Sequence, residues 1–190
     1  MRTFIAIELP EDIKDRLGRL QDKLRKCGAD VKWVEPENIH LTLKFLGERD
    51  DKKIAKISEI VAETAKNHLP FLAHITSVGA FPKIDYPRVI WVGVEQGDAE
   101  TKKIAQELEE KIATVGIPKE DRPFSSHITI GRTRSPKNRE KLVASLKNYV
   151  ENLAGENLEF TVGKITLFKS TLAPSGPVYE ALKEITLTTT

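Results

Sequence analysis

The same strand, helix, strand pattern occurs twice in the chain, and this internal repeat constrains the fold more than any other feature. The first copy opens with His40-Leu41-Thr42-Leu43, and the second opens with His127-Ile128-Thr129-Ile130, 87 residues further along. The last strands of the two copies match at intervals of 89 and 90 residues, in the pairs Phe71 with Phe160 and Ile75-Thr76 with Ile165-Thr166. Small insertions in the loops account for the increase of the interval from 87 to 90 residues. The repeat predicts two tandem α+β lobes with an approximate internal symmetry.

Hydrophobic periodicity supplies the other elements. Apolar residues recur at helical spacing in residues 11–27, 51–67, 98–115 and 138–153. Strands are expected at residues 3–8, 31–34, 39–46, 71–78, 89–94, 127–133, 159–169 and 178–187. No Pro- or Ser-rich linker separates the two copies, so we expect residues 1–190 to form a single domain of two packed lobes.

The doubled motif suggests one site built from two halves. Side chains alternate along a strand, so His40 and Thr42 share one face while the two aliphatic residues face the core. Two imidazoles can divide acid and base roles near neutral pH, and two hydroxyls can hold an anion. A single histidine of this kind is more often structural, but the equivalent placement of His40 and His127 favours function. A third match, at His74, is followed by Ser77 and lies opposite Lys164 in the repeat, so we predict a half-exposed strand histidine there.

Composition and missing motifs narrow the function classes. Lys and Arg number 30 against 28 Asp and Glu, which neither favours nor excludes nucleic acid, because a local basic surface is compatible with a small net charge. The single Cys27 excludes an internal disulfide, and no motif for a metal ligand set or a Gly-rich phosphate loop is present, so we expect neither metal nor cofactor. No apolar run approaches 18 residues, and we predict a cytoplasmic protein. Few Cys and Met with many Lys and Glu fit a thermophile.

Basic and aromatic residues near the motifs are candidates for substrate contact. By alternation Lys44 lies on the face of His40 and Thr42, whereas Arg132 points to the opposite face unless a bulge at Gly131 redirects it. The alternative for both is a solvated surface charge. Residues able to stack on a base, or else to pack in the core, are Phe81, Tyr86, Trp91 and Tyr179.

Residues 33–47, Trp33 to Gly47, and 124–132, Phe124 to Arg132, resemble the two signature motifs of the 2H phosphoesterase superfamily. Within it the chain is most similar to the RNA 2′,3′-cyclic phosphodiesterases, also called the 2′-5′ RNA ligase family. Residues 2–7, 87–93 and 170–179 fit as well, so the resemblance covers nearly the whole chain. Ser126 stands where the family commonly has a proline, and we expect it to change only the stiffness of the loop.

The resemblance implies a bilobal α+β fold, with two pseudo-symmetric lobes of mostly antiparallel sheet, helices on the outer faces and a central cleft. It implies opening of a 2′,3′-cyclic phosphate at an RNA 3′ end to a 2′-phosphate, and reversible 2′-5′ ligation of tRNA halves. His40 is then the proton donor and His127 the acceptor. The phosphate is bound by Thr42, Thr129 and Arg132, and further candidates for substrate contact are Lys44 and Tyr179. We expect a monomer that acts without metal.

Two other interpretations stay open. In the first, the chain is an RNA-end or tRNA-binding module with little turnover. In the second, it is an enzyme that acts on a 2′-5′ oligonucleotide or a small cyclic phosphate. Salt-dependent binding without product would favour the first. Product formation compared across substrates would identify the second.

Overall fold

The computed structural model describes residues 1–188, apart from the side chains of residues 151, 152 and 154. Residues 189 and 190, the last two of the predicted domain, lie outside the described residues. The helices are α1 (Glu11–Arg25), α2 (Asp51–Ala65), α3 (Asp98–Ala113) and α4 (Arg139–Asn152), with 3-10 turns at Pro36–Asn38 and Leu153–Gly155. The strands are β1 (Arg2–Glu8), β2 (Val31–Trp33), β3 (His40–Glu48), β4 (Phe71–Lys83), β5 (Tyr86–Val94), β6 (His127–Thr133), β7 (Glu159–Val162), β8 (Lys164–Ala173) and β9 (Gly176–Thr186).

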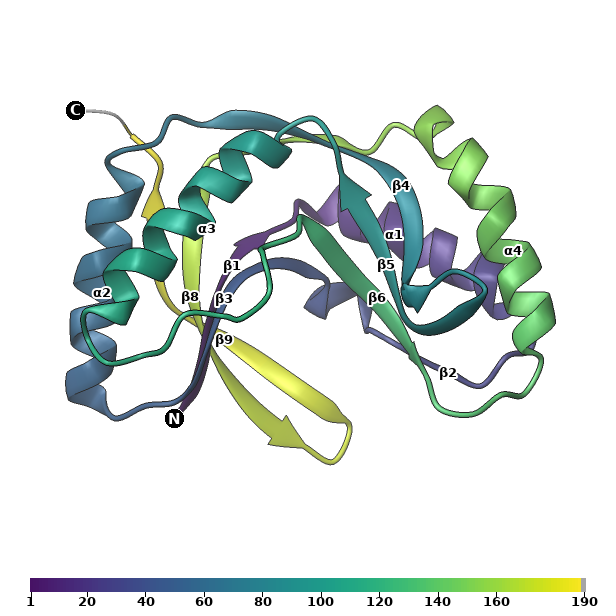
Figure 1. Cartoon of the computed structure of the whole chain (residues 1–190), viewed down its shortest axis with the longest axis horizontal. Helices are drawn as coiled ribbons and strands as arrows, with labels where there is room; N and C mark the ends of the chain where they lie inside the picture. Colours follow the sequence, from purple (N-terminus) through teal and green to yellow (C-terminus); the bar gives the residue numbers. More distant parts are fainter. Residues whose placement is uncertain (189–190) are drawn as a thin grey trace.

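The strands form two antiparallel sheets, which define two lobes. Lobe A has the strand order β3-β1-β8-β9, and lobe B has the order β2-β6-β5-β4-β7. Helices α2 and α3 lie on the outer side of lobe A, and α1 and α4 lie on lobe B, so that the sheets are between the helix pairs (Figure 1). The predicted bilobal α+β architecture is confirmed. We call the sheet surfaces turned away from the helices the inner faces.

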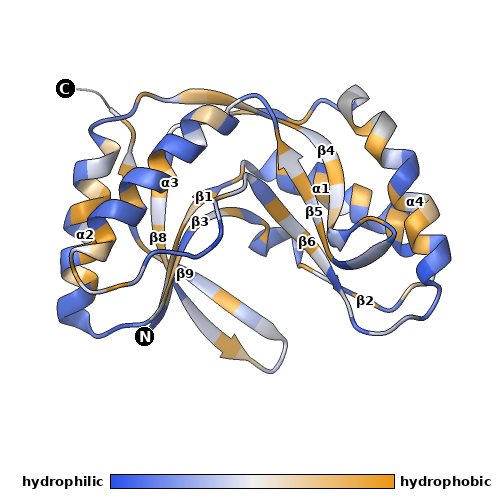
Figure 2. Cartoon of the chain, in the orientation of Figure 1, coloured by the Kyte–Doolittle hydropathy of each residue, from blue (hydrophilic) through white to orange (hydrophobic). Residues whose placement is uncertain are grey.

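Amphipathic helices bury one side against each sheet. In α2 the apolar positions Ile57, Val61 and Ala65 are fully buried, and Asp50 caps the helix by accepting a hydrogen bond from the Lys53 amide at 2.8 Å. Apolar segments of the helices alternate with polar ones in Figure 2. Each fully buried aliphatic side chain contributes about 1.5–3 kcal/mol relative to an exposed one. One continuous apolar cluster runs through both lobes.

The tandem arrangement of the two lobes was predicted wrongly, because the lobes exchange elements. Strand β8 from the second half pairs with β1, placing Thr166 opposite Ala6, and β4 from the first half pairs with β5, placing Gly79 opposite Trp91. Helix α3 packs with α2 on lobe A, while α1 contacts α4 on lobe B. The first half of the chain therefore gives β2, β4 and α1 to lobe B, and the second half gives β8, β9 and α3 to lobe A.

The strand registers also correct the alignment of the repeat. In lobe A Phe168 lies opposite Phe4, and in lobe B Phe81 lies opposite Val89, at corresponding places in the two sheets. Phe81 and Phe168 are 87 residues apart, as the motif histidines are, so they are the equivalent pair. The predicted match of Ile75-Thr76 with Ile165-Thr166 is wrong by three residues.

Residues 159–169, predicted as one strand, form two strands in different sheets. Phe160 of β7 pairs with Ala73 in lobe B, whereas β8 joins lobe A. The chain crosses between the lobes at Gly163, whose carbonyl accepts a hydrogen bond from the Leu187 amide at 2.9 Å. A strand that changes partner sheets cannot keep one continuous ladder, which explains the break. Strands β4 and β5 are longer than predicted because they pair with each other up to Lys83 and Tyr86.

Candidate active site

His40 lies on the inner face of lobe A with one ring nitrogen fixed. Its Nδ1 is 2.6 Å from the carbonyl oxygen of Asn38. A carbonyl only accepts, so Nδ1 carries a proton and Nε2 is the nitrogen left to exchange one. The ring stacks on Phe4 at 4.8 Å between centroids, and the edge of Tyr179 approaches at 5.3 Å. These contacts hold the imidazole in one orientation.

Burial dominates the protonation of His40. It lowers the pKa of the imidazole below its usual value, and the positive charge of Lys14 acts in the same direction. The hydrogen bond to the Asn38 carbonyl and the negative charge of Glu8 oppose this effect. The Asn38 carbonyl and Glu8 therefore favour the charged imidazolium of His40, whereas its buried surroundings disfavour the charge.

His127 lies flat on an indole on the inner face of lobe B. Its ring stacks on Trp91 at 3.6 Å with an interplanar angle of 7°, and Phe81 lies 5.3 Å away. The indole itself lies over two glycines. A Cβ at Gly79 would come within 2.2 Å of a Trp91 ring carbon, and one at Gly93 within 3.2 Å. The absence of these side chains makes room for Trp91, and Trp91 positions His127.

Charges at the start of α3 act on His127. Burial lowers its pKa, the carboxylate of Asp98 raises it, and Lys102 lowers it. Asp98 and Lys102 form an ion pair at 2.9 Å. Gly97 holds the cap position of α3 with φ 90°, and Asp98 is the first helical residue. Asp98 is therefore a site residue that the sequence reasoning missed, because its local pattern is that of an ordinary helix start.

Equivalent β-bulges decide which side chains after each motif reach the inner face. The register of β3 against β1 skips Leu43, and that of β6 against β5 skips Ile130. Each extra residue inverts the alternation that follows it. Arg132 thereby pairs with Val89 and lies on the face of Trp91 and His127. The hypothesis that a bulge near Gly131 redirects Arg132 is confirmed.

The same bulge turns Lys44 away from the site. Lys44 pairs with Ile5, whose side chain is in the core, and it is only 2% exposed. Its ammonium forms an ion pair with Glu109 of α3 at 2.6 Å and donates to the Pro118 carbonyl at 3.0 Å. The prediction that Lys44 shares the face of His40 is wrong. Phe45 takes the inner-face position instead, opposite Phe4.

The remaining predicted residues lie near the two histidines. Thr42 is opposite Ala6 and Thr129 is opposite Trp91, both on the inner faces and both half-buried. Burial raises the pKa of Tyr179, and the positive charges of Arg2 and Arg132 oppose that rise. Arg132 of lobe B thus acts electrostatically on a side chain of lobe A that touches His40. The strands β3 and β6 also contact each other directly.

Other aromatic residues and histidines are placed as follows. Phe4 and Phe168, which the sequence reasoning missed, stack at 5.2 Å and form the floor under His40. His74 lies in the β4–β7 ladder opposite Glu159. His68 follows α2, and its Nε2 lies 2.6 Å from a carboxylate oxygen of Glu107 of α3.

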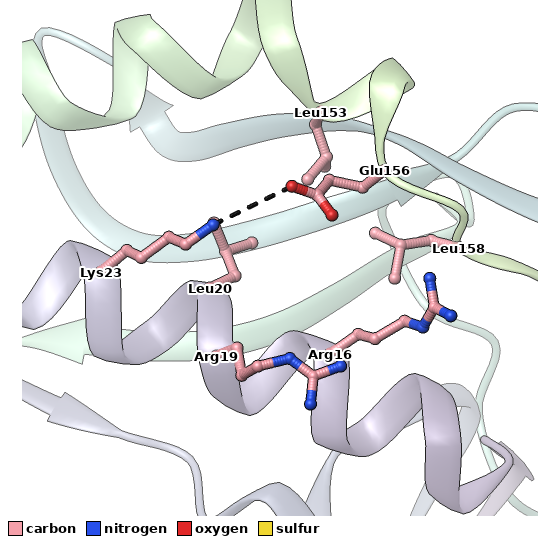
Figure 3. Close-up of a pocket in the computed structure, with 7 residues that line it drawn as sticks. All are labelled: Arg16, Arg19, Leu20, Lys23, Leu153, Glu156 and Leu158. Atoms are coloured by element: carbon pink, nitrogen blue, oxygen red, sulfur yellow. Dashed lines mark ion pairs between the residues drawn. The ribbon is translucent and has the colours of Figure 1, made fainter.

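Of two pockets in the structure, one is lined by the predicted site residues His40 and Tyr179. It has a volume of about 240 Å³ and lies beside His40, with Lys14, Glu8, Asn38, Phe168 and Tyr179 among its walls. The other, of about 90 Å³, lies on the outer side of lobe B between α1 and the segment that follows α4 (Figure 3). Its walls carry Arg16, Arg19 and Lys23, and Lys23 pairs with Glu156 at 4.0 Å. The candidate site consists of the pocket beside His40 and the inner faces next to it.

Neither a cluster of metal ligands nor a membrane-spanning helix occurs among the described residues. Within residues 1–188, no group of three or more His, Cys, Asp or Glu side chains is placed to hold a metal ion. No helix in the same part of the chain is long and apolar enough to cross a membrane.

Two His-x-Thr strands, one on each of two pseudo-symmetric antiparallel sheets, are the architecture of a two-histidine phosphoesterase. The model of the LigT-like phosphoesterase family matches the chain twice, at residues 7–91 and 92–179, so that each match contains one motif. The chain belongs to this family.

Relatives and solved structures agree with that assignment. An RNA 2′,3′-cyclic phosphodiesterase of Methanocaldococcus jannaschii is 38% identical over 184 residues, covering 97% of this chain and 99% of the relative. One from Methanothermobacter thermautotrophicus is 36% identical and covers 94% and 95%. The crystal structure of TT0787 from Thermus thermophilus superposes with a TM-score of 0.84 at 32% identity, covering 100% and 99%. E. coli LigT complexed with 3′-AMP gives 0.80 at 27%, covering 98% of each chain. The first three of these sources fit the thermophile prediction, whereas E. coli does not.

Proposed function

We propose that this enzyme opens 2′,3′-cyclic phosphates at RNA 3′ ends to 2′-phosphates, in the cytoplasm and as a monomer. The observation that carries the proposal is the pair of imidazoles, His40 and His127, each oriented by aromatic stacking and each with a threonine two residues along its strand. The names of the relatives, RNA 2′,3′-cyclic phosphodiesterases, support the choice of substrate.

The two histidines have different surroundings, which supports a division of labour. The Asn38 carbonyl and Glu8 favour the imidazolium of His40, so His40 is proposed as the acid that protonates the departing ribose 3′ oxygen. His127 is proposed as the base that takes a proton from water. Its Nδ1 is buried with no hydrogen-bond partner among the described residues, which is the feature that distinguishes it from His40. Burial lowers the pKa of His127, as it does for His40, and the Asp98 carboxylate opposes this effect. A neutral imidazole is the form that accepts a proton.

Threonines and an arginine would stabilise the phosphate. Thr42 and Thr129 lie two residues beyond the histidines on the same inner faces, where their hydroxyls can donate to non-bridging oxygens. Arg132 adds a positive charge on that side of lobe B. Charge that develops on the phosphorane is stabilised by such fixed donors. Tyr179 is proposed to contact the nucleotide next to His40, whereas Lys44, buried against Glu109, is not included.

The same groups support 2′-5′ ligation of RNA ends such as tRNA halves. A 5′-hydroxyl replaces water as the nucleophile, and His127 and His40 keep their roles. Splitting of a 2′-5′ linkage follows by microscopic reversibility, with the roles interchanged.

The test uses a short RNA that ends in a 2′,3′-cyclic phosphate, incubated with EDTA. We expect product ending in a 2′-phosphate, and a loss on the order of 10²–10⁴ in rate for His40→Ala and for His127→Ala. His74→Ala, which removes the third His-x-Thr histidine, is the matched control and should keep the wild-type rate. An unchanged rate in either motif variant would refute the two-histidine mechanism. Tight RNA binding without any product would indicate the binding module instead.

A further inference from the structure

Phe81 presents an open aromatic face directly beside His127. It lies on the inner face of β4, with its ring 5.3 Å from His127 and 5.6 Å from Trp91. Despite these contacts it is 45% exposed. A half-exposed phenylalanine next to a proposed general base offers a stacking surface to whatever approaches that base.

Comparison with the equivalent position in lobe A shows that this exposure is specific to lobe B. Phe168 occupies the matching place beside His40, yet it is only 8% exposed. Phe4 lies 5.2 Å from Phe168, and Tyr179 of β9 lies 6.4 Å from it. In lobe B the outer neighbour of β4 is β7, which pairs only with residues 71–74 and ends far along the strand from Phe81. The protein thus covers one of two equivalent rings and leaves the other open.

We propose that Phe81 stacks the base of the nucleoside whose 5′ oxygen enters or leaves on the His127 side. The proposal rests on the proposed function, because it uses the assignment of His127 as the base. In ligation the 5′ oxygen forms the new bond to phosphorus while the bond from phosphorus to the 3′ oxygen breaks. The 5′-hydroxyl proton passes to His127, and the proton on His40 passes to the 3′ oxygen. No other reactant is required.

If a base stacks on Phe81, the two reactions of the site should depend on this ring to different extents. Hydrolysis of a cyclic phosphate brings only water to His127, so no base occupies Phe81. Joining or splitting a 2′-5′ linkage brings a second nucleoside there. Stacking of one base on an aromatic side chain changes binding by roughly 5–150-fold. Loss of the Phe81 ring should therefore lower kcat/KM for the 2′-5′ reaction by about that factor more than kcat/KM for hydrolysis.

The experiment measures kcat/KM for two substrates in each variant. One is a 2′-5′-linked dinucleoside monophosphate, which is split at the bond to the 5′ oxygen, and the other is a nucleoside 2′,3′-cyclic phosphate, which is hydrolysed. For Phe81→Leu, which keeps apolar contact with Trp91, we expect the ratio of the first kcat/KM to the second to fall roughly 5–150-fold. Phe81→Trp should keep or raise it. The ratio does not depend on the fraction of folded enzyme.

Phe45→Leu is the matched control, since Phe45 is an inner-face phenylalanine of lobe A that is 63% exposed. Whatever nucleotide it touches on the His40 side is common to both substrates, so the ratio should stay at the wild-type value. Equal losses for both substrates in Phe81→Leu would overturn the proposal, as would a wild-type enzyme that opens cyclic phosphates but never splits the 2′-5′ linkage. Failure of the wild type to open the cyclic phosphate would instead refute the proposed function.

Discussion

The buried pair of Lys44 and Glu109 allows a quantitative test of the bulge in β3. The Lys44 side chain is 1% exposed and that of Glu109 is 18% exposed, with 2.6 Å between the charged atoms. Glu109→Gln leaves the ammonium buried without a counter-ion, although Pro118 still accepts its hydrogen bond. Breaking a buried pair in this way costs about 3–5 kcal/mol. For a protein of this size that lowers Tm by about 6–20 °C.

Removing the lysine should cost less than removing the glutamate. In Lys44→Met the buried charge disappears, and Glu109 can turn its carboxylate to solvent. The main penalty is then the unpaired Pro118 carbonyl, about 1–3 kcal/mol. The double variant Lys44→Met/Glu109→Gln should be no less stable than Glu109→Gln alone, because the two effects share one interaction.

Urea unfolding of the wild type, both single variants and the double variant completes the cycle. Additive effects of the two substitutions would refute a coupled buried pair. Steady-state kinetics supply the second readout, since kcat/KM per folded molecule should be unchanged in Lys44→Met. A tenfold or greater loss in folded Lys44→Met would show that Lys44 reaches the substrate and that the bulge argument fails.

Three further outcomes are expected. Burial lowers the pKa of both His40 and His127 below 6.5, so the bell-shaped profile of kcat/KM against pH should have its maximum on the acid side of that value, and a maximum above pH 7.5 would contradict this. Gly79→Ala places a methyl group against Trp91 and should cost about 1–3 kcal/mol in stability, measured by thermal unfolding, with a fall in kcat as His127 loses its platform. Arg132→Gln should lower kcat/KM by more than tenfold with little change in Tm, because this charge is exposed on the inner face and is proposed to stabilise the phosphorane.

Local patterns in the sequence predicted the elements well and the faces of the strands only in part. Alternation placed His40 with Thr42 correctly, because those residues precede the bulge in β3. It failed for Lys44 two residues later, since a bulge is a property of the pairing with β1 rather than of β3 alone. The glycine after the second motif gave a local signal for Arg132, and the first motif has no such glycine.

Long-range partners were the part of the fold that the sequence did not reveal. The repeat predicted two lobes, and the family model also divides the chain into two halves. Nothing in the spacing shows that β4 and β8 are exchanged, because an exchanged strand buries the same apolar residues as an unexchanged one. The covered floor of Phe4 and Phe168 under His40 was missed for the same reason, since it forms only when strands from both ends of the chain meet.

The exchange of β4 and β8 also sets the order in which the molecule can fold. Ala6 pairs with Thr166, so the second strand from the edge of lobe A has a neighbour that is synthesised only after both His-x-Thr motifs. Closing so long a loop carries a high entropic cost before any contact forms, and domains with such non-local pairings fold slowly. Neither half of the repeat can complete a sheet alone. We therefore expect the floor beneath His40 to form only once β8 is available, and a nascent chain cut short before β8 to carry its first motif on an incomplete sheet.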